Sequence, residues 1–91
     1  MGLGKNNMKY FVYILQSEVV DRFYIGVTKN IDTRLEKHNS GSSKSTKPYC
    51  PWKIIYSEEF DDKYVAYKRE YFLKRPKGYL EKKSIIRDNR F

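Results

Sequence analysis

Apolar and aromatic residues gather in short runs along the chain, and three of these runs predict β-strands. Residues 10–17 (YFVYILQS) are mostly aromatic or branched and end in polar residues, which is typical of a strand. Residues 22–28 (RFYIGVT) and residues 52–60 (WKIIYSEEF) repeat this character. Because only a short segment separates the first two runs, we expect them to form a hairpin.

Helical spacing begins directly after the second of these runs. Ile31 and Leu35 lie four positions apart and give one apolar stripe. Thr28 or Asn30 can cap the first free amides of such a helix, and Gly41 is a suitable residue just beyond its end. We therefore expect a helix between these two signals.

Two more helices are predicted in the second half of the chain. Residues 63–74 (KYVAYKREYFLK) follow two aspartates suited to a helix start, and Pro76 forces a break after them. Residues 79–89 (YLEKKSIIRDN) predict a last short helix. The segment Ser40–Pro51 is rich in Ser, Lys and Thr without periodicity, so we expect a basic surface loop there.

The resulting order, β-β-α-β-α-α, predicts an α+β domain with a small three-stranded, mostly antiparallel sheet and flanking helices. We expect the third strand to lie beside the first, with the first helix crossing the sheet. Residues 9–86 form the expected domain, residues 1–8 a flexible leader, and residues 87–91 a short C-terminal tail.

Alternation separates the two faces of the first two strands. One face is apolar throughout and collects Val12, Ile14, Phe23, Ile25 and Val27. The other face brings Tyr13 and Tyr24 near one another, beside Gly26. A glycine within a strand leaves an open spot, so we expect a binding place between the two phenols.

The 63–74 helix carries an acid on its expected apolar side. Spacing by three and four predicts a buried stripe made of Lys63, Ala66, Tyr67, Glu70, Leu73 and Lys74. A carboxylate withdrawn from water needs a cation, a metal ion or several hydrogen-bond donors. Glu70 is therefore either a metal ligand or a partner in an ordinary ion pair with Arg34 or Lys74.

Composition narrows the class of protein. Nineteen Lys and Arg against eleven Asp and Glu give the 91-residue chain a net charge of +8, which favours a polyanionic partner such as nucleic acid. The aromatic content of 16% argues against a disordered basic tail. The single cysteine, Cys50, excludes an internal disulfide and a Cys-rich zinc site. With no membrane-length apolar run and no signal-peptide pattern, we expect a cytoplasmic protein.

An ordered set of residues resembles the GIY-YIG nuclease family. The set begins with FVY at residues 11–13 and YIG at residues 24–26, and it continues through Arg34, His38 and Glu70. The resemblance spans roughly residues 9–86. The chain is most similar to the small stand-alone branch related to the nuclease module of bacterial excision-repair endonuclease.

This resemblance implies a metal-dependent endonuclease that hydrolyses phosphodiester bonds of DNA, with RNA as an alternative substrate, in DNA repair or recombination. It gives Tyr24 the role of general base or water-activating group, with Tyr13 in support. Arg34 would contact the scissile phosphate, His38 would be the histidine of the stand-alone branch, and Glu70 would hold one Mg²⁺ or Mn²⁺. The resemblance does not identify the acceptor of the Tyr24 proton.

The chain departs from the family pattern at two positions. Phe11 stands where the first motif has glycine, and Asn89 lies too far along the chain to match the late asparagine of some members. The remaining residues suit the chemistry independently. One carboxylate can hold Mg²⁺ together with waters, and an Arg fork matches a phosphate better than Lys does.

Basic residues outside the motif are candidate nucleic-acid contacts, and their ordinary alternative is solubilising charge. They are Lys44, Lys47, Lys74, Arg75 and Lys77. A domain of this length has little room for a recognition module, so we expect salt-sensitive binding that prefers structure over sequence. A binding module that kept the fold and lost useful turnover is the alternative function.

Overall fold

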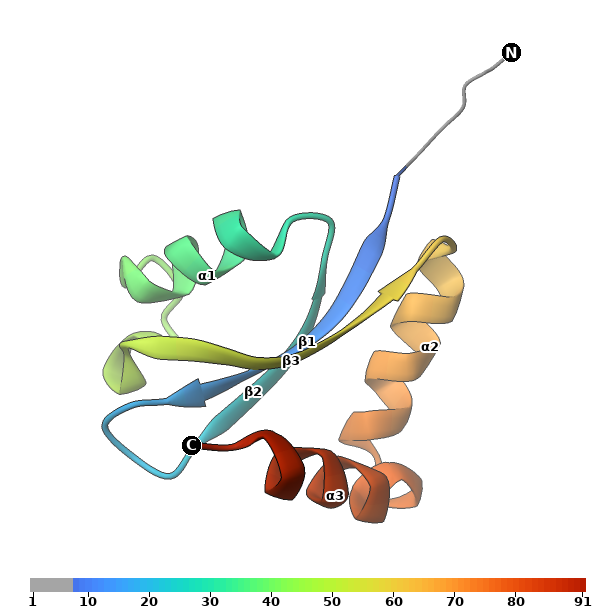
Figure 1. Ribbon diagram of the computed structural model, residues 1–91. Helices are drawn as coiled ribbons and strands as arrows, with labels where there is room; N and C mark the ends of the chain where they lie inside the picture. The colour runs from blue at the N-terminus through green and yellow to red at the C-terminus, as the bar shows by residue number, and fades with distance from the viewer. Residues whose placement is uncertain (1–7) are drawn as a thin grey trace.

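The computed structural model describes residues 8–91, so most of the expected leader lies outside the described residues. Figure 1 shows the predicted β-β-α-β-α-α order, which confirms the α+β class. The elements are β1 (Tyr10–Ser17), β2 (Phe23–Thr28), α1 (Ile31–Asn39), β3 (Trp52–Phe60), α2 (Lys63–Lys74) and α3 (Tyr79–Asn89), with single-turn 3-10 helices η2 (Lys47–Tyr49) and η3 (Pro76–Gly78).

The sheet has the order β2-β1-β3, and both pairings are antiparallel. The third strand therefore lies beside the first, as predicted. β1 is the central strand and is buried from Val12 to Ser17. Its register places Tyr13 opposite Gly26 of β2 and Ser57 of β3, so the second motif lies directly beside the first.

Helices cover both faces of the sheet (Figure 1). On one face, Val12 and Ile14 of β1 pack with Ile25 of β2 and with Ala66 and Leu73 of α2. The opposite face has its own core of Tyr13, Leu15 and Trp52, against which Tyr24, Leu35 and Ile54 are partly buried. Central β1 contributes alternate side chains to each core, which confirms the predicted separation of the two faces.

Local capping explains where two helices begin. The Asn30 side chain accepts a hydrogen bond from the Thr33 amide at 3.0 Å, so Asn30 rather than Thr28 is the cap of α1. Asp62 caps α2 by accepting from the Tyr64 amide at 2.7 Å. Gly41, just beyond α1, has φ +81°, a conformation that favours glycine.

The structure corrects the predicted buried stripe of α2. Ala66 and Leu73 are fully buried, but Lys63, Tyr67 and Lys74 are exposed. The helix packs on β1 and β2 more than on β3, so one of its flanks lies toward the β2 edge of the sheet. On the other flank Arg69 is half-buried and donates to the Glu58 carboxylate of β3 from Nε at 2.7 Å.

The C-terminal residues lie against the β1–β2 hairpin. Residues 87–89 are the last turn of α3. Arg90 then pairs with Asp21 at 2.8 Å, and the Phe91 amide donates to Gln16 Oε1 at 3.0 Å. Within residues 8–91, no helix has the length and apolarity needed to cross a membrane.

Candidate active site

Tyr13, His38 and Thr46 form a buried chain of hydrogen bonds beneath α1. The Tyr13 hydroxyl lies 3.2 Å from Nε2 of His38, and Nδ1 of His38 lies 2.9 Å from the Thr46 hydroxyl. All three residues are at most 3% exposed. Thr46 belongs to the loop predicted to be at the surface, and that expectation was wrong here because its hydroxyl is needed as a partner for the buried imidazole.

The last hydrogen bond, from Thr46, determines which atom donates and which accepts in the other two. The Thr46 hydroxyl donates to the Ser43 carbonyl at 3.4 Å, because a carbonyl can only accept. Thr46 then accepts from Nδ1–H of His38, which leaves Nε2 free to accept from the Tyr13 hydroxyl. The neutral imidazole that this requires agrees with the pKa of His38, which burial and then the Arg34 charge lower from its ordinary value.

The Tyr13 hydroxyl is held in its protonated form. Burial raises the pKa of Tyr13 well above its ordinary value, and the neighbouring Tyr24 and Glu70 act in the same direction, while Arg34 opposes them. These four side chains come from β1, β2, α1 and α2. The charges of Arg34 and Glu70 thus both influence the pKa of Tyr13, as is expected if the predicted residues share one site.

Tyr24 packs on the same histidine from the neighbouring strand. Its ring centroid lies 4.7 Å from that of His38 and 6.2 Å from that of Tyr13. Tyr24 is half-buried, so its phenol is more open to solvent than that of Tyr13. Of the two motif tyrosines, Tyr24 is the one that can reach a substrate.

Gly26 leaves no gap between the two phenols, contrary to the sequence expectation. A Cβ atom at this position would lie 2.6 Å from the Tyr13 hydroxyl oxygen and 3.0 Å from Tyr24 Cε2. The space freed by the missing side chain is therefore filled by the Tyr13 ring. The glycine of the second motif positions the tyrosine of the first.

Glu70 lies on the flank of α2 that faces this cluster. Its side chain is 19% exposed and forms an ion pair with Lys74 at 3.2 Å. Lys74 Nζ in turn lies 5.9 Å from the centroid of the Tyr24 ring. Of the two ion pairs considered from sequence, the structure forms the one with Lys74 and not the one with Arg34.

A single carboxylate in this position fits one Mg²⁺ or Mn²⁺ ion. Such an ion keeps several waters and binds phosphate oxygens directly, so it needs few protein ligands. Glu70 supplies one such carboxylate, while the Arg34 guanidinium, which has no lone pair to give a cation, can only contact the phosphate. Within the described part of the chain, no cluster of three or more His, Cys, Asp or Glu side chains suited to a metal was found.

An open groove of about 370 Å³ runs between α1 and α2 along the β2 edge. Arg34 lines it, together with residues that the sequence analysis had not singled out for this role. These are Lys37 on α1 and Lys63 and Tyr67 on α2. Only the packing of α1 and α2 on the sheet brings them beside Arg34, so the sequence alone carried no signal for them.

The five basic residues predicted to contact nucleic acid fall in two places. Lys44 and Lys47 lie in the loop after α1, and both are exposed. Lys74, Arg75 and Lys77 lie at the end of α2 and in η3, where Lys74 approaches Tyr24. The second group is therefore the one that adjoins the candidate site.

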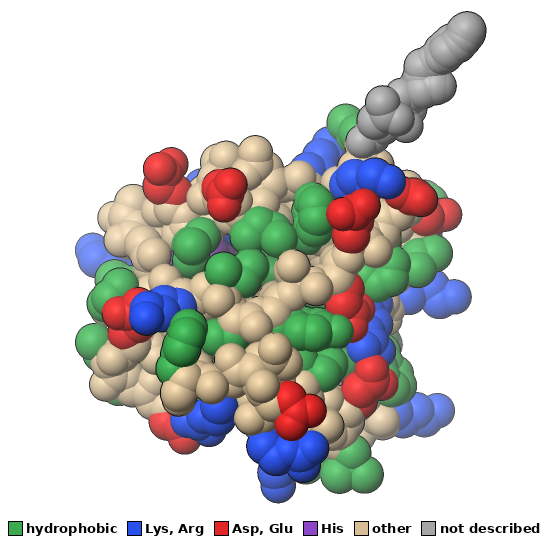
Figure 2. Space-filling view, in the orientation of Figure 1, with side chains coloured by type: hydrophobic (Ala, Val, Ile, Leu, Met, Phe, Trp, Pro, Cys, Tyr) green, Lys and Arg blue, Asp and Glu red, His purple; other side chains and the backbone are tan. Residues whose placement is uncertain are grey.

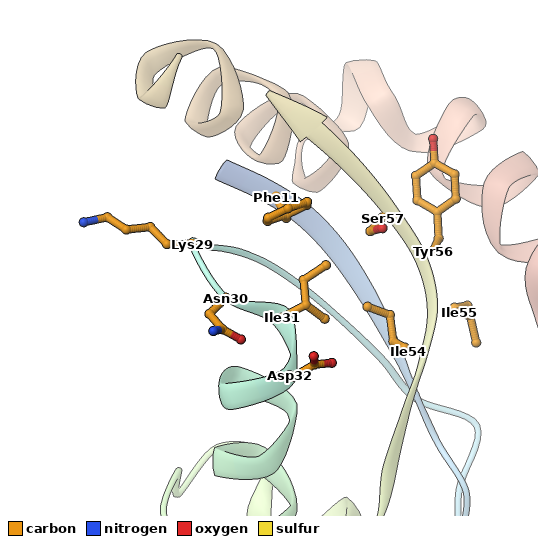
Figure 3. A pocket seen from close by; sticks show the side chains of 9 residues that line it. All are labelled: Phe11, Lys29, Asn30, Ile31, Asp32, Ile54, Ile55, Tyr56 and Ser57. Carbon is orange, nitrogen blue, oxygen red and sulfur yellow. The ribbon is translucent and has the colours of Figure 1, made fainter. Parts of the chain in front are cut away.

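The two departures from the family motif lie outside this cluster. Phe11 lines a separate hollow of about 680 Å³ between α1 and β3, with Ile31 and Ile54 (Figure 3). The Asn89 side chain donates to the Ile85 carbonyl of its own helix at 2.7 Å. Neither residue contacts the Tyr13–His38 pair through any hydrogen bond found among residues 8–91.

Charged side chains of both signs mingle on the face shown in Figure 2, where β3 passes in front of β1. Several acids near β3 are paired with bases, including Glu59 with Lys9 and Glu18 with Lys53. This face therefore offers no uniformly basic surface, in contrast to the groove with Arg34, Lys37 and Lys63.

Similar proteins share both sequence and fold with this chain. A family model described as the GIY-YIG catalytic domain matches residues 9–83. A UPF0213 protein of Staphylococcus saprophyticus is 40% identical over 67 residues, covering 72% of this chain and 80% of the relative. A UPF0213 protein of Lactococcus lactis is 37% identical over 83 residues, covering 89% and 78%.

A solved structure extends the comparison to three dimensions. The solution NMR structure of a UPF0213 protein from Bacillus halodurans aligns with a TM-score of 0.51 and 30% sequence identity. The alignment covers 86% of this chain and 85% of that one. The family match over residues 9–83 includes both tyrosine motifs, Arg34, His38 and Glu70.

Proposed function

This chain belongs to the GIY-YIG catalytic domain family, and from that membership we propose that it is a divalent-metal-dependent endonuclease that hydrolyses phosphodiester bonds in DNA. The observation that supports the proposal most directly is that three other predicted site residues all interact with the Tyr13 hydroxyl. His38 accepts from it, and the charges of Arg34 and Glu70 both act on it. These residues are far apart in sequence, and the packing of a sheet alone does not require them to lie together.

Each side chain has a role that its surroundings support. The Arg34 guanidinium binds the scissile phosphate and neutralises charge that develops on its oxygens. Tyr24, the more accessible phenol, orients and activates the attacking water. Tyr13 is a hydrogen-bond donor kept in place by His38, because its raised pKa opposes loss of its proton.

Glu70 is the residue that would hold the metal ion. When bound, Mg²⁺ or Mn²⁺ supplies charge neutralisation at the phosphate and at the leaving oxygen. Lys74 orients the carboxylate until then, through the 3.2 Å ion pair. Lys44, Lys47, Arg75 and Lys77 contribute to affinity through phosphates.

The finer parts of the proposal rest on similarity to the nuclease module of bacterial excision repair. They are DNA rather than RNA as the substrate, a setting in repair or recombination, and action in the cytoplasm. The excess of 19 basic over 11 acidic residues supports a polyanionic substrate of either kind.

The test is cleavage of supercoiled plasmid and of short branched and single-stranded DNA with Mg²⁺ or Mn²⁺. The unmodified chain is compared with Tyr24→Phe, Arg34→Ala and Glu70→Gln. Loss of cleavage in all three variants supports the nuclease and its site. Equal cleavage in all four proteins indicates a contaminating nuclease. Salt-sensitive binding without cleavage by any of them favours the alternative, a binding module that kept the fold.

A further inference from the structure

Large aromatic side chains are exposed along α2 and at the start of α3. Tyr67 is 49% exposed, Tyr71 61% and Tyr79 50%. We call these three residues the tyrosine track. Exposed rings of this size leave apolar surface in water, and none of the three phenols has a hydrogen-bond partner among those found within residues 8–91. Their exposure therefore calls for a partner outside the chain.

The tyrosine track begins at the candidate active site. Residues 67, 70, 71 and 74 share one flank of α2, because they are separated by three or four positions. Tyr67 lines the groove that also contains Arg34, and Glu70 lies on the same flank. Tyr79 continues the track beyond the end of α2, where it lines a further hollow with Lys74 and Arg75.

Basic side chains accompany the rings along their whole length. The Arg75 guanidinium lies 4.9 Å from the centroid of the Tyr71 ring. Lys82 and Lys83 each place Nζ 5.7 Å from the centroid of the Tyr79 ring. The acids nearby are already engaged: Glu70 pairs with Lys74, and Glu81 pairs with Arg69 on the other flank of α2.

We propose that the tyrosine track binds the unpaired bases of a single-stranded nucleic acid, while the neighbouring Lys and Arg side chains hold its phosphates. Aromatic rings interleaved with basic residues bind single strands in this way, since every base has a face that can stack. A duplex hides those faces within its own stack and presents phosphates to a surface. A duplex would therefore use the charges and leave the rings without a role.

Binding of a single strand to the tyrosine track depends on the proposed nuclease function in one respect only, namely that the bound nucleic acid leads toward the cleavage site. A single-stranded segment on the tyrosine track leads into the groove with Arg34, so the cleaved phosphate lies at or beside an unpaired stretch. The favoured substrates are single strands, flaps and branched DNA with a free arm. Fully paired linear DNA is the least favoured.

The test measures binding, not cleavage. Fluorescence anisotropy follows a labelled oligothymidine and a duplex of equal length, in the presence of a chelator, for the full chain. Replacing both Tyr67 and Tyr71 by Ala should weaken binding to the single strand about tenfold or more, with duplex binding changed less than about twofold. Replacing both by Phe should retain single-strand binding, because stacking needs the ring and not the hydroxyl.

Leu80→Ala is the matched control, because Leu80 is 78% exposed and lies outside the tyrosine track. Equal loss on duplex and single strand, or no loss on either, overturns the proposal. A loss as large with Phe as with Ala also overturns it. Ring-dependent binding without any cleavage would support the tyrosine track and contradict the proposed nuclease activity. Cleavage with unchanged binding by the Ala variant would do the reverse.

Discussion

The missing side chain of Gly26 is the space that the Tyr13 ring occupies: a Cβ atom there would lie 2.6 Å from the Tyr13 hydroxyl oxygen. The two residues are directly opposite each other in the β1–β2 register. This pairing links the two tyrosine motifs physically, because a side chain in the second would displace the phenol of the first and break its bond to His38.

Gly26→Ala should therefore destabilise the fold by about 1–3 kcal/mol, the usual range for overpacking a filled core, and should abolish cleavage. Denaturant unfolding and a cleavage assay measure the two effects. The control is the same change in a Tyr13→Ala background. There it should be neutral or slightly stabilising, since alanine suits a strand better than glycine does. A full cost in that background would contradict the steric explanation.

Thr46→Val removes the hydroxyl that accepts from His38 while keeping the shape of the side chain. We expect a loss of about 1–2 kcal/mol in the free energy of unfolding, because a buried imidazole N–H is left without its partner. Thr46→Ser keeps the hydroxyl and should restore most of the stability and the activity. If valine and serine behave alike, the hydrogen bond has no such role.

Stability should depend on pH through His38. Its pKa is lowered in the folded protein, so below its ordinary value of 6.5 the unfolded chain binds the proton more readily. The free energy of unfolding should be highest above pH 6.5, decrease as the pH falls below it, and level off below the folded pKa. His38 is the single histidine of the chain, so His38→Gln should remove this slope. If the pH dependence of stability persists in the variant, another titrating group causes it.

The Arg69–Glu58 pair is structural and lies away from the site. Arg69→Met should cost about 2 kcal/mol, because it removes both guanidinium donors from a half-buried carboxylate and leaves it the Tyr56 hydroxyl. Arg69 is the main reason that the pKa of Glu58 lies below its ordinary value of 4.5. The stability that it supplies is complete above pH 4.5 and is lost as the pH falls through the folded pKa.

Two comparisons check the Arg69 prediction. Arg87→Met, which removes an exposed pair with Asp88, should change stability by less than about 0.5 kcal/mol. At a temperature where Arg69→Met remains folded, its cleavage rate should equal that of the unmodified chain. A loss of activity in the folded variant would place Arg69 in the site.

Glu70→Gln should remove Mn²⁺ binding in a calorimetric titration, together with cleavage. An amide is nearly the same size as the carboxylate but lacks the charge that holds a hard cation. Glu36→Gln on α1 is the matched control, because Glu36 is exposed and outside the groove. Unchanged Mn²⁺ affinity in Glu70→Gln would show that the metal is bound elsewhere.

Alternation and capping residues were enough to predict the fold. The two faces of β1 and the Asp62 cap depend on local spacing, which a sequence displays directly, and the place of β3 beside β1 follows from the general rules for connections between strands. The family motif supplied Tyr13, Tyr24, Arg34, His38 and Glu70 as a candidate set. Their chemical roles remain predictions until the variants are measured.

What the sequence could not show depends on how elements are placed relative to one another. Thr46 sits among serines and lysines, so nothing in its neighbourhood marks it as buried under α1. The exposure of Tyr67 and Lys63 follows from how α2 packs on the sheet, which helical periodicity does not encode. The gap expected at Gly26 is filled by the Tyr13 ring. Alternation along a strand does not account for the volume of a side chain on the opposite strand, so the sequence could not show this.

The candidate site draws on β1, β2, α1 and α2, with Tyr13 near one end of the chain and Glu70 near the other. This distribution has a consequence during synthesis. A ribosome-bound chain that has not yet released α2 lacks Glu70, the carboxylate proposed to hold the metal ion. Under the proposed function, hydrolysis then requires that almost the whole domain has emerged and folded.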